Sequence, residues 1–188
     1  MNRFRNFIGI TTAIIALGAV SVSAQGYAGG KKYVNRASDS SISQQIYHEL
    51  RMLPHYGVFD YITYQVNGGN VVLTGKVYSL GTTSSIVSTV KRMPGVTSVV
   101  NNIEDLPPSP SDERIRREAL RTFANRGLSG YFWETNPDVR IIVDRGRITL
   151  EGYVMNKGDL NAMNIYANGI SGVFGVQNNL IVGTPPKG

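Results

Sequence analysis

The sequence predicts an α+β fold, built after a signal peptide from two tandem small α/β sandwiches, each running helix, strand, strand, helix, strand. Three observations predict it: a repeated strand pattern, a repeated spacing of apolar residues in the helices, and a proline-rich segment between the copies. The strand pattern reads GNVVLTGKV at 69–77 and GRITLEGYV at 146–154. Apolar residues stand at every second position, which is typical of a strand that buries one face.

The two copies align with each other over most of their length. With a shift of 77 residues, positions 61–106 share eleven identities with the later copy, against about three expected by chance. Upstream, SDSSI at 38–42 pairs with SDERI at 111–115 at a shift of 73. The second copy therefore carries a four-residue insertion between its first helix and its first strand.

The first 24 residues are predicted to be a signal peptide. Arg3 and Arg5 precede an apolar run that ends near Val22, and the small residues up to Ala24 fit signal-peptidase cleavage. Cleavage after Ala24 would deliver the mature chain to the periplasm, and an uncleaved anchor is the alternative. Residues 25–37 are then predicted to be a flexible linker.

The rest of the chain is predicted to hold a first domain at 38–106, a proline-rich linker at 107–110, a second domain at 111–183 and a disordered tail at 184–188. In each domain, apolar residues on one side predict the first helix, and the second helices repeat their spacing in the same way. The first helices are marked by Ile42, Ile46, Leu50 and Leu53 and by Ile115, Ala119 and Phe123. The second helices are marked by Ile86, Val90 and Met93 and by Met163, Ala167 and Ile170.

Six glycines are predicted to have structural roles: Gly69, Gly75, Gly95, Gly146, Gly152 and Gly172. Gly69 and Gly146 stand in VNGGNV and VDRGRI, where a short hairpin loop needs a left-handed residue. Gly75 and Gly152 lie inside strands, and we expect a helix to cross the sheet closely there. The remaining pair belongs to the turn before the last strand of each copy.

These motifs resemble those of a known family. GNVVLTGKV with GVTSVVNNI, and GRITLEGYV with GVFGVQNNL, are similar to the BON (bacterial OsmY and nodulation) domain. Two such domains after a signal peptide resemble the OsmY-like periplasmic proteins of Gram-negative envelopes. The resemblance implies a role in envelope protection and osmotic stress, and binding of phospholipid surfaces.

The two copies differ most in the first helix of the second copy and in the loop after it. Arg114, Arg117 and Arg121 fall on the side of this helix opposite its apolar residues, and we call them the arginine stripe. The loop that follows contains Phe132 and Trp133. Guanidinium groups bind phosphate and tryptophan favours the membrane interface, so these five residues are the predicted site for an anionic membrane surface.

An alternative interpretation of the same residues stays open. Glu118 has the spacing to pair with Arg114 and Arg121, so the stripe is equally explained as an ordinary solvated helix face. The aromatic residues of the loop are equally explained as closing the core, as Tyr56, Phe59 and Tyr61 are expected to do in the first copy.

The sequence argues against several other functions. The chain has no cysteine, which excludes a lipoprotein anchor at its N-terminus, thiol catalysis and cysteine-bound metal. His48 and His55 have no acid arranged beside them to complete a metal site. The net charge of +6 is too small for a nucleic-acid footprint. We therefore expect no enzyme activity, no cofactor, no small-molecule substrate and no nucleic-acid partner.

Three binding functions remain in view. The first is docking on anionic phospholipid in envelope maintenance. The second is interaction with an envelope protein, or chaperone-like protection in osmotic stress. The third is an adaptor for cell-wall polymer, in which tyrosine rings stack on sugars. High salt should weaken the first and leave apolar protein contacts largely unchanged.

Overall fold

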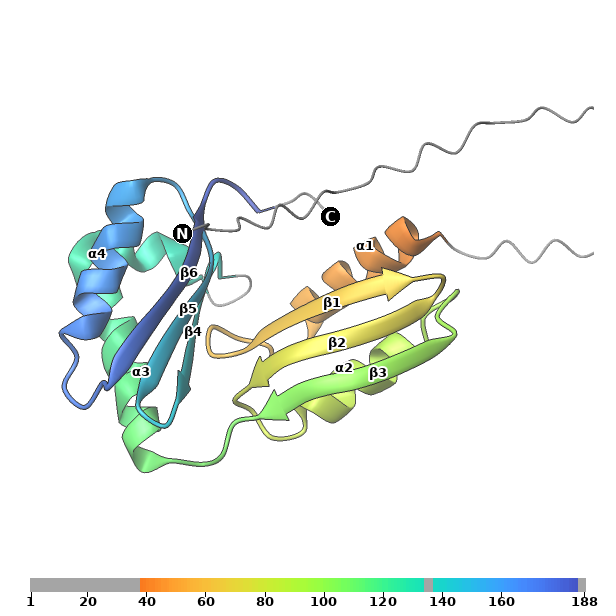
Figure 1. The fold of residues 1–188 in the computed structure, drawn as a ribbon, viewed down its shortest axis with the longest axis horizontal. Helices are drawn as coiled ribbons and strands as arrows, with labels where there is room; N and C mark the ends of the chain where they lie inside the picture. The colour runs from red at the N-terminus through yellow and green to blue at the C-terminus, as the bar shows by residue number, and fades with distance from the viewer. Residues whose placement is uncertain (1–37, 134–136, 186–188) are drawn as a thin grey trace, which may run out of the picture. The chain divides into compact units, whose positions relative to one another are not determined.

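The computed structural model describes residues 38–133 and 137–185, which form two copies of the predicted unit (Figure 1). The signal peptide, its cleavage site, the linker at 25–37 and residues 186–188 of the tail lie outside the described residues, so these assignments stay predictions. No helix in the described ranges is both long enough and apolar enough to cross a membrane.

Each copy, here called repeat one and repeat two, contains two helices and a three-stranded sheet. In repeat one the elements are α1 (Asp39–Met52), β1 (Tyr61–Asn67), β2 (Asn70–Val77), α2 (Thr82–Lys91) and β3 (Ser98–Asp105). In repeat two they are α3 (Pro110–Phe123), β4 (Val139–Asp144), β5 (Arg147–Val154), α4 (Lys157–Asn168) and β6 (Gly175–Val182). The predicted fold class and element order are confirmed.

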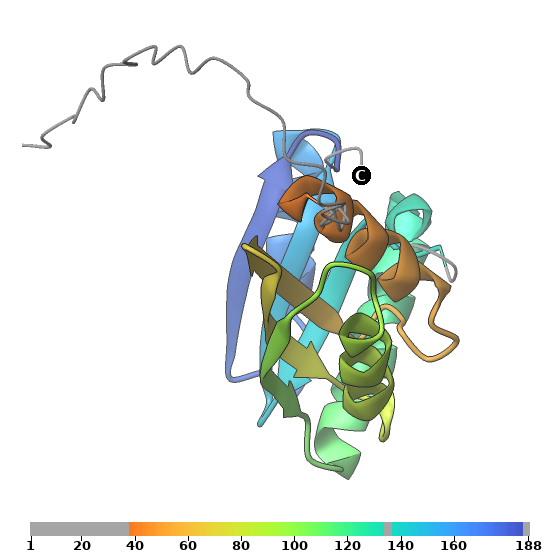
Figure 2. The same ribbon diagram turned by 90° about the vertical axis from the view of Figure 1, so that its right-hand side faces the viewer.

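The two sheets have the same topology. Strand order is β1-β2-β3 in repeat one and β4-β5-β6 in repeat two, with an antiparallel hairpin followed by a parallel third strand. The parallel strand requires a crossover connection, which α2 and α4 supply. Both helices of a repeat pack against one face of its sheet (Figure 2).

The four-residue insertion of repeat two lies directly after α3. There the chain forms a short π-helical segment, Ala124–Leu128, and a single 3-10 turn, Ser129–Tyr131. Tyr131 is buried, and its hydroxyl accepts a hydrogen bond from the backbone N–H of Met155. The insertion therefore adds packing to repeat two before the chain enters β4.

Local sequence explains where the first helices begin. Ser38 caps α1 by accepting a hydrogen bond from the N–H of Ser41, and Ser109 caps α3 in the same way for Asp112. Pro110 occupies the first turn of α3, where its missing N–H costs nothing. The cap of α3 stands two residues earlier than that of α1, because the alignment pairs Ser38 with Ser111.

Each repeat has its own hydrophobic core, and the predicted helix faces supply it. Ile42, Ile46 and Leu50 of α1 are buried against β1 and β2, and Ile115, Ala119 and Phe123 of α3 play the same part in repeat two. The prediction that Tyr56 helps to close the first core is confirmed. Phe59 instead packs, with Val58, against the core of repeat two, so that part of the prediction is wrong.

Both hairpins turn through residues with positive φ. Gly68 and Gly69 have φ of 58° and 80°, and Arg145 and Gly146 have φ of 49° and 73°. Two consecutive left-handed residues form the type I′ turn that matches the twist of a β-hairpin. Arg145 adopts this conformation although it is not a glycine, which is an uncommon and mildly strained choice.

The two turns are held by the same side chain in each repeat. Asp39, in the first turn of α1, accepts hydrogen bonds from the N–H groups of Gly68 and Gly69 at 2.7 and 3.0 Å. Asp112 accepts them from Arg145 and Gly146 at 3.0 and 2.8 Å. The aspartate that SDSSI and SDERI share therefore ties down the hairpin turn in each repeat.

The glycines inside the strands have a different reason from the one predicted. A Cβ atom on Gly75 would lie 2.0 Å from the carbonyl oxygen of Tyr61, and one on Gly152 would lie 2.0 Å from that of Asp138. Both residues have positive φ, 148° and 115°. The close neighbour is therefore the backbone at the start of the adjacent hairpin strand, not a helix. The expected helix crossing is wrong.

Both repeats belong to one compact unit. The N–H of Ile141 donates to the carbonyl oxygen of Val58 at 2.8 Å, and Arg140 Nη1 donates to that of Gly57 at 2.5 Å. Lys76 Nζ lies 2.6 Å from Asp144 Oδ2. A backbone hydrogen bond, a hydrogen bond from a buried arginine and an ion pair therefore join the two copies.

Candidate functional site

Two members of the arginine stripe are paired with acids of their own helix. Arg121 Nη2 lies 2.6 Å from Glu118 Oε2, and Arg117 Nε lies 3.9 Å from Glu113 Oε1. Both arginine side chains are exposed, so these are ordinary surface ion pairs of small energetic value. For this part of the stripe the geometry favours a solvated helix face.

Arg114 is placed differently from the other two. Its Nη1 donates to the carbonyl oxygen of Ser171 at 3.0 Å, and its guanidinium lies against Gly172 in the loop between α4 and β6. The guanidinium of Arg114 therefore points away from the other two arginines of the stripe. It lies at the end of repeat two that holds the β4–β5 turn.

The two predicted aromatic residues also separate. The ring of Phe132 is stacked on that of buried Phe123, with centroids 5.5 Å apart, and it packs against the core of repeat two. Trp133 follows immediately, and 72% of it is exposed. Of this pair, Trp133 alone presents its ring to solvent.

A second aromatic side chain, missed in the sequence, is exposed at the end of repeat two. Phe174 stands just before β6 and is 78% exposed. Its N–H donates to the carbonyl oxygen of Gly146 at 2.8 Å, and its ring lies over that glycine, where a Cβ would be 2.6 Å from Phe174 Cδ2. The backbone therefore fixes Phe174 while its ring faces outward.

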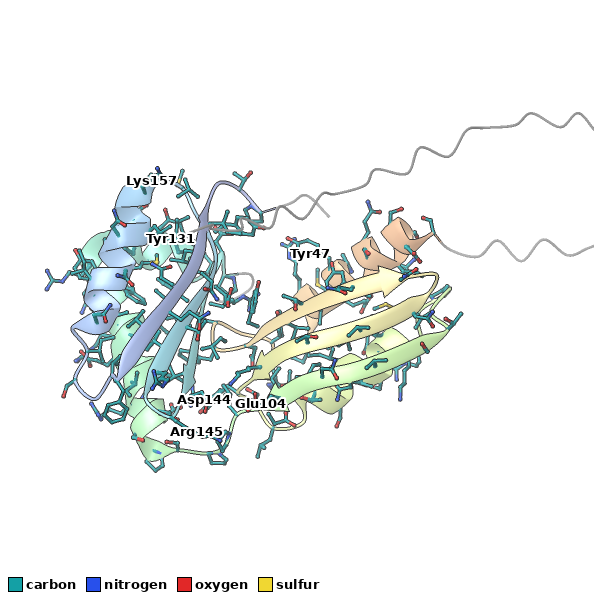
Figure 3. All side chains as sticks on the ribbon, viewed as in Figure 1. Tyr47, Glu104, Tyr131, Asp144, Arg145 and Lys157 are labelled. Atoms are coloured by element: carbon teal, nitrogen blue, oxygen red, sulfur yellow. The ribbon has the colours of Figure 1, made fainter. Side chains whose placement is uncertain are left out.

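Arginines lie in the segments next to this ring. Arg145 occupies the β4–β5 turn with 84% of its side chain exposed (Figure 3), and Arg147 reaches across to the start of β6 beside Gly175. Arg114 arrives from α3. We call Arg114, Arg145, Arg147 and Phe174 the repeat-two tip.

The arginines of the repeat-two tip make few ion pairs with acidic side chains. Arg145 Nε lies 3.9 Å from Asp144 Oδ1, but Asp144 is shared with Lys76. In the described part of the chain, no acidic side chain lies within ion-pair distance of Arg147. Asp112, beneath the turn, accepts hydrogen bonds from two backbone N–H groups and makes no ion pair with the tip arginines. The tip thus combines three positive charges with an exposed aromatic ring.

The equivalent positions of repeat one carry none of these groups. They are Ser41, Gly68, Asn70 and Thr97. Here Thr97 donates its hydroxyl hydrogen to Asn70 Oδ1 at 3.1 Å, and Ser98 does so at 2.7 Å. The same backbone turn is therefore finished with small, neutral, mutually bonded side chains.

Sequence reasoning had the signal needed to find the tip. The shift of 77 places Arg145, Arg147 and Phe174 opposite Gly68, Asn70 and Thr97. The predicted site instead rested on the first helix of the second copy and the loop after it. What the alignment lacked was the proximity of the β4–β5 turn to the α4–β6 loop, which follows from the parallel pairing of β5 with β6.

Two further arginines of repeat two are buried. Arg116 is 1% exposed; its Nη2 donates to the carbonyl oxygen of Val143 and its guanidinium lies 4.4 Å from the ring centre of Tyr78. Arg140 lies 4.5 Å from the ring centre of Tyr56, and burial lowers its pKa. Both stack on tyrosines of repeat one and join the repeats.

Among residues 38–133 and 137–185, no three His, Asp or Glu side chains lie close enough together to hold a metal ion.

A family model described as the BON domain matches residues 38–104 and 111–184. The similar solved structures include two of CdsD, the structural protein of the type III secretion system of Chlamydia trachomatis. One, its C-terminal domain, has 14% identity and a TM-score of 0.33, over 78% of this chain and 67% of that one. The other has 14% identity and a TM-score of 0.32, over 77% and 93%. A search of curated proteins found no match.

Proposed function

The chain belongs to the BON domain family, and we propose that it is a non-enzymatic envelope protein of the periplasm that docks reversibly on anionic phospholipid surfaces. The observation that carries the proposal is the repeat-two tip, where an exposed phenylalanine stands among three arginines. The role belongs to envelope maintenance, of the kind needed under osmotic stress.

The charges of the tip suit a phosphate-bearing surface. Arginine presents a planar fork of donors that matches phosphate oxygens. Each basic residue near an anionic bilayer contributes about 1 kcal/mol. Arg114, Arg145 and Arg147 would together contribute about 3 kcal/mol, which falls as salt screens the attraction.

The aromatic ring supplies the apolar part of the interaction. Phe174 is held by a backbone hydrogen bond, so little further order is needed when it enters the interface. Burial of its side chain would add about 2 kcal/mol. Charge and ring together correspond to weak docking, in which dissociation is fast and many molecules can exchange on the surface.

The tip and the paired arginines predict different mutational patterns. If the arginine stripe and Trp133 make the contact, Arg117→Glu and Trp133→Ala should weaken binding most. If the tip makes it, Arg147→Glu should weaken binding most, and Arg117 should matter little because Glu113 already pairs with it. Arg147, which has no acidic partner among the described residues, and the outward ring of Phe174 favour the tip.

The test is co-sedimentation of the purified protein with vesicles of phosphatidylglycerol and cardiolipin, at low and high salt, with phosphatidylcholine vesicles as the control. We expect binding to the anionic vesicles alone, and its loss at high salt. Arg147→Glu should weaken binding about 30-fold, because it removes one attraction and adds one repulsion. Asn70→Glu, the matched change in repeat one, should weaken it less than about threefold.

Absence of binding to anionic vesicles at low salt would contradict the proposal and leave interaction with an envelope protein as the better function. Equal losses in Arg147→Glu and Asn70→Glu would keep the membrane function but reject the tip.

A further inference from the structure

A groove lined by five tyrosines lies on another part of the molecule. Its volume is about 140 Å³, and repeat one contributes four of the rings. We call these residues the tyrosine groove: Tyr47, Tyr56, Tyr61, Tyr64 and Tyr153. None of the tip residues lines it, and its lining combines five tyrosine rings with Arg51 and Arg140.

The rings of the groove are partly buried and several are fixed. The hydroxyl of Tyr56 accepts a hydrogen bond from the N–H of Ile62 at 3.1 Å, and the hydroxyl of Tyr64 donates to the carbonyl oxygen of Ser43 at 3.0 Å. Tyr47 extends from α1 beside them (Figure 3), with the guanidinium carbon of Arg51 5.3 Å from its ring centre. These contacts prepare a rigid aromatic surface before any ligand arrives.

The walls of the groove are joined by direct bonds. Arg140 lies over Tyr56 and donates to the carbonyl oxygen of Gly57, and the neighbouring Ile141 donates its N–H to Val58. On the other wall, the N–H of Tyr153 donates to the carbonyl oxygen of Asp138 at 2.9 Å. The groove is thus formed by the contact between the repeats and depends on it.

One of the chain's own prolines lines this groove. Pro185 follows β6, lines the groove with the tyrosines, and is partly buried there. It belongs to the sequence GTPPKG that ends the chain. Proline-rich segments adopt the extended polyproline II helix without help, and aromatic-lined grooves bind them at low entropic cost.

We propose that the tyrosine groove is a binding site for proline-rich peptide segments in the polyproline II conformation, and that the chain's own Thr184–Pro185 segment competes for it. A partner with exposed proline-rich sequence gains access when it displaces this segment. The inference stands apart from membrane docking, because the two sites share no residue.

Sugar stacking is the rival use of tyrosine rings, and the groove favours peptide over sugar. A sugar needs free hydroxyls or amides along the rings to bind its own hydroxyl groups. Two of the tyrosine hydroxyls, those of Tyr56 and Tyr64, are already bonded to backbone groups. Pro185 also lines the groove, so a proline ring already lies beside these tyrosines.

The test uses a fluorescein-labelled decaproline peptide and measures fluorescence anisotropy with the purified protein. A labelled Gly-Ser decapeptide is the negative control, and a fluorescein-labelled chito-oligosaccharide is the rival ligand. Two variants address the competing segment: Pro185→Ala and a chain that ends at Gly183. Three address the rings: Tyr47→Ala and Tyr47→Phe in the groove, and Tyr166→Ala on α4 outside it.

We expect decaproline to bind and the Gly-Ser peptide not to bind. Removing the competing segment should tighten binding about threefold or more, since the free fraction of the groove rises. Tyr47→Ala should weaken binding about tenfold, Tyr47→Phe should retain it, and Tyr166→Ala should leave it unchanged.

The proposal is overturned if decaproline binds neither the intact chain nor the chain that ends at Gly183. It is also overturned if Tyr47→Ala and Tyr166→Ala have equal effects, or if the chito-oligosaccharide binds in the groove and decaproline does not. Vesicle binding by each variant is measured in parallel, so that failure here is not confused with failure of membrane docking.

Discussion

The two repeats share one backbone and finish it differently at equivalent ends. In both, an aspartate in the first helix ties down the hairpin turn, and the residue before the last strand bonds to the turn glycine. In repeat one that residue is Thr97, within a neutral cluster; in repeat two it is Phe174, within a cluster of arginines. The difference teaches that a duplicated scaffold keeps its internal bonds while its outer side chains diverge toward a function.

The largest expected effect falls on what the repeats have in common. Gly152→Ala should lower the free energy of unfolding of repeat two by about 3 kcal/mol, because the new Cβ clashes with the carbonyl oxygen of Asp138 and φ is positive. Gly75→Ala should do the same to repeat one. Urea unfolding followed by circular dichroism and Trp133 fluorescence measures both.

Gly130→Ala is the control for this prediction, since nothing lies within 4 Å of its Cβ position. A cost below about 1 kcal/mol at either strand glycine would show that the backbone moves to admit the Cβ. That result would contradict the claim that both repeats require glycine at this position.

The aspartates should separate the repeats by burial. Asp112 is 2% exposed and accepts two backbone hydrogen bonds, so Asp112→Ala leaves buried N–H groups unpaired and should cost about 2 kcal/mol. Asp39 is partly exposed, and water can replace it; Asp39→Ala should cost about 1 kcal/mol. Thermal unfolding of the two variants side by side checks the order, and a larger loss for Asp39→Ala would reverse it.

Transfer of the tip should carry function with it. Phe174→Ala should weaken binding to anionic vesicles about tenfold or more while leaving the unfolding transition nearly unchanged, because the ring is exposed. Placing Thr97→Phe and Asn70→Arg together in repeat one should strengthen binding several-fold, since each added group contributes about 1 kcal/mol or more. A vesicle titration with unchanged affinity in both variants would dissociate the tip from binding.

The smallest effect is expected at the paired arginines. Arg117→Glu and Arg121→Glu should each change vesicle affinity about threefold or less, because Glu113 and Glu118 already partner these side chains at the surface. The same titration measures them. A loss comparable to that of Arg147→Glu would move the site onto the arginine stripe.

Much of the fold could be predicted, because local sequence patterns specify its strands, helices and turns. Alternating apolar residues predicted the strands, helical spacing predicted the buried faces of α1 and α3, and VNGGNV predicted a left-handed turn. The internal repeat then tested each assignment twice. The reason for Gly75 and Gly152 was missed, because a close approach between two backbone segments leaves no apolar pattern in the sequence.

The site was harder to predict, because it depends on which loops meet. Arg114 was singled out from its helix, but its contact with Ser171 joins residues 57 positions apart. Phe132 and Trp133 look alike in the sequence, and only packing against Phe123 distinguishes the ring that is covered from the ring that is exposed. Arg116 and Arg140 read as surface residues until their tyrosine partners are known.

The most direct test of the account places a tryptophan at each tip. In a Trp133→Phe background, Phe174→Trp and its counterpart Thr97→Trp are mixed with phosphatidylglycerol vesicles that contain brominated lipid, and tryptophan quenching is measured. The account predicts a blue shift and quenching for the tryptophan at 174, and neither for the one at 97. Equal quenching at both positions would contradict it. So would quenching of Trp133 in the unmutated protein together with no quenching of the tryptophan at 174.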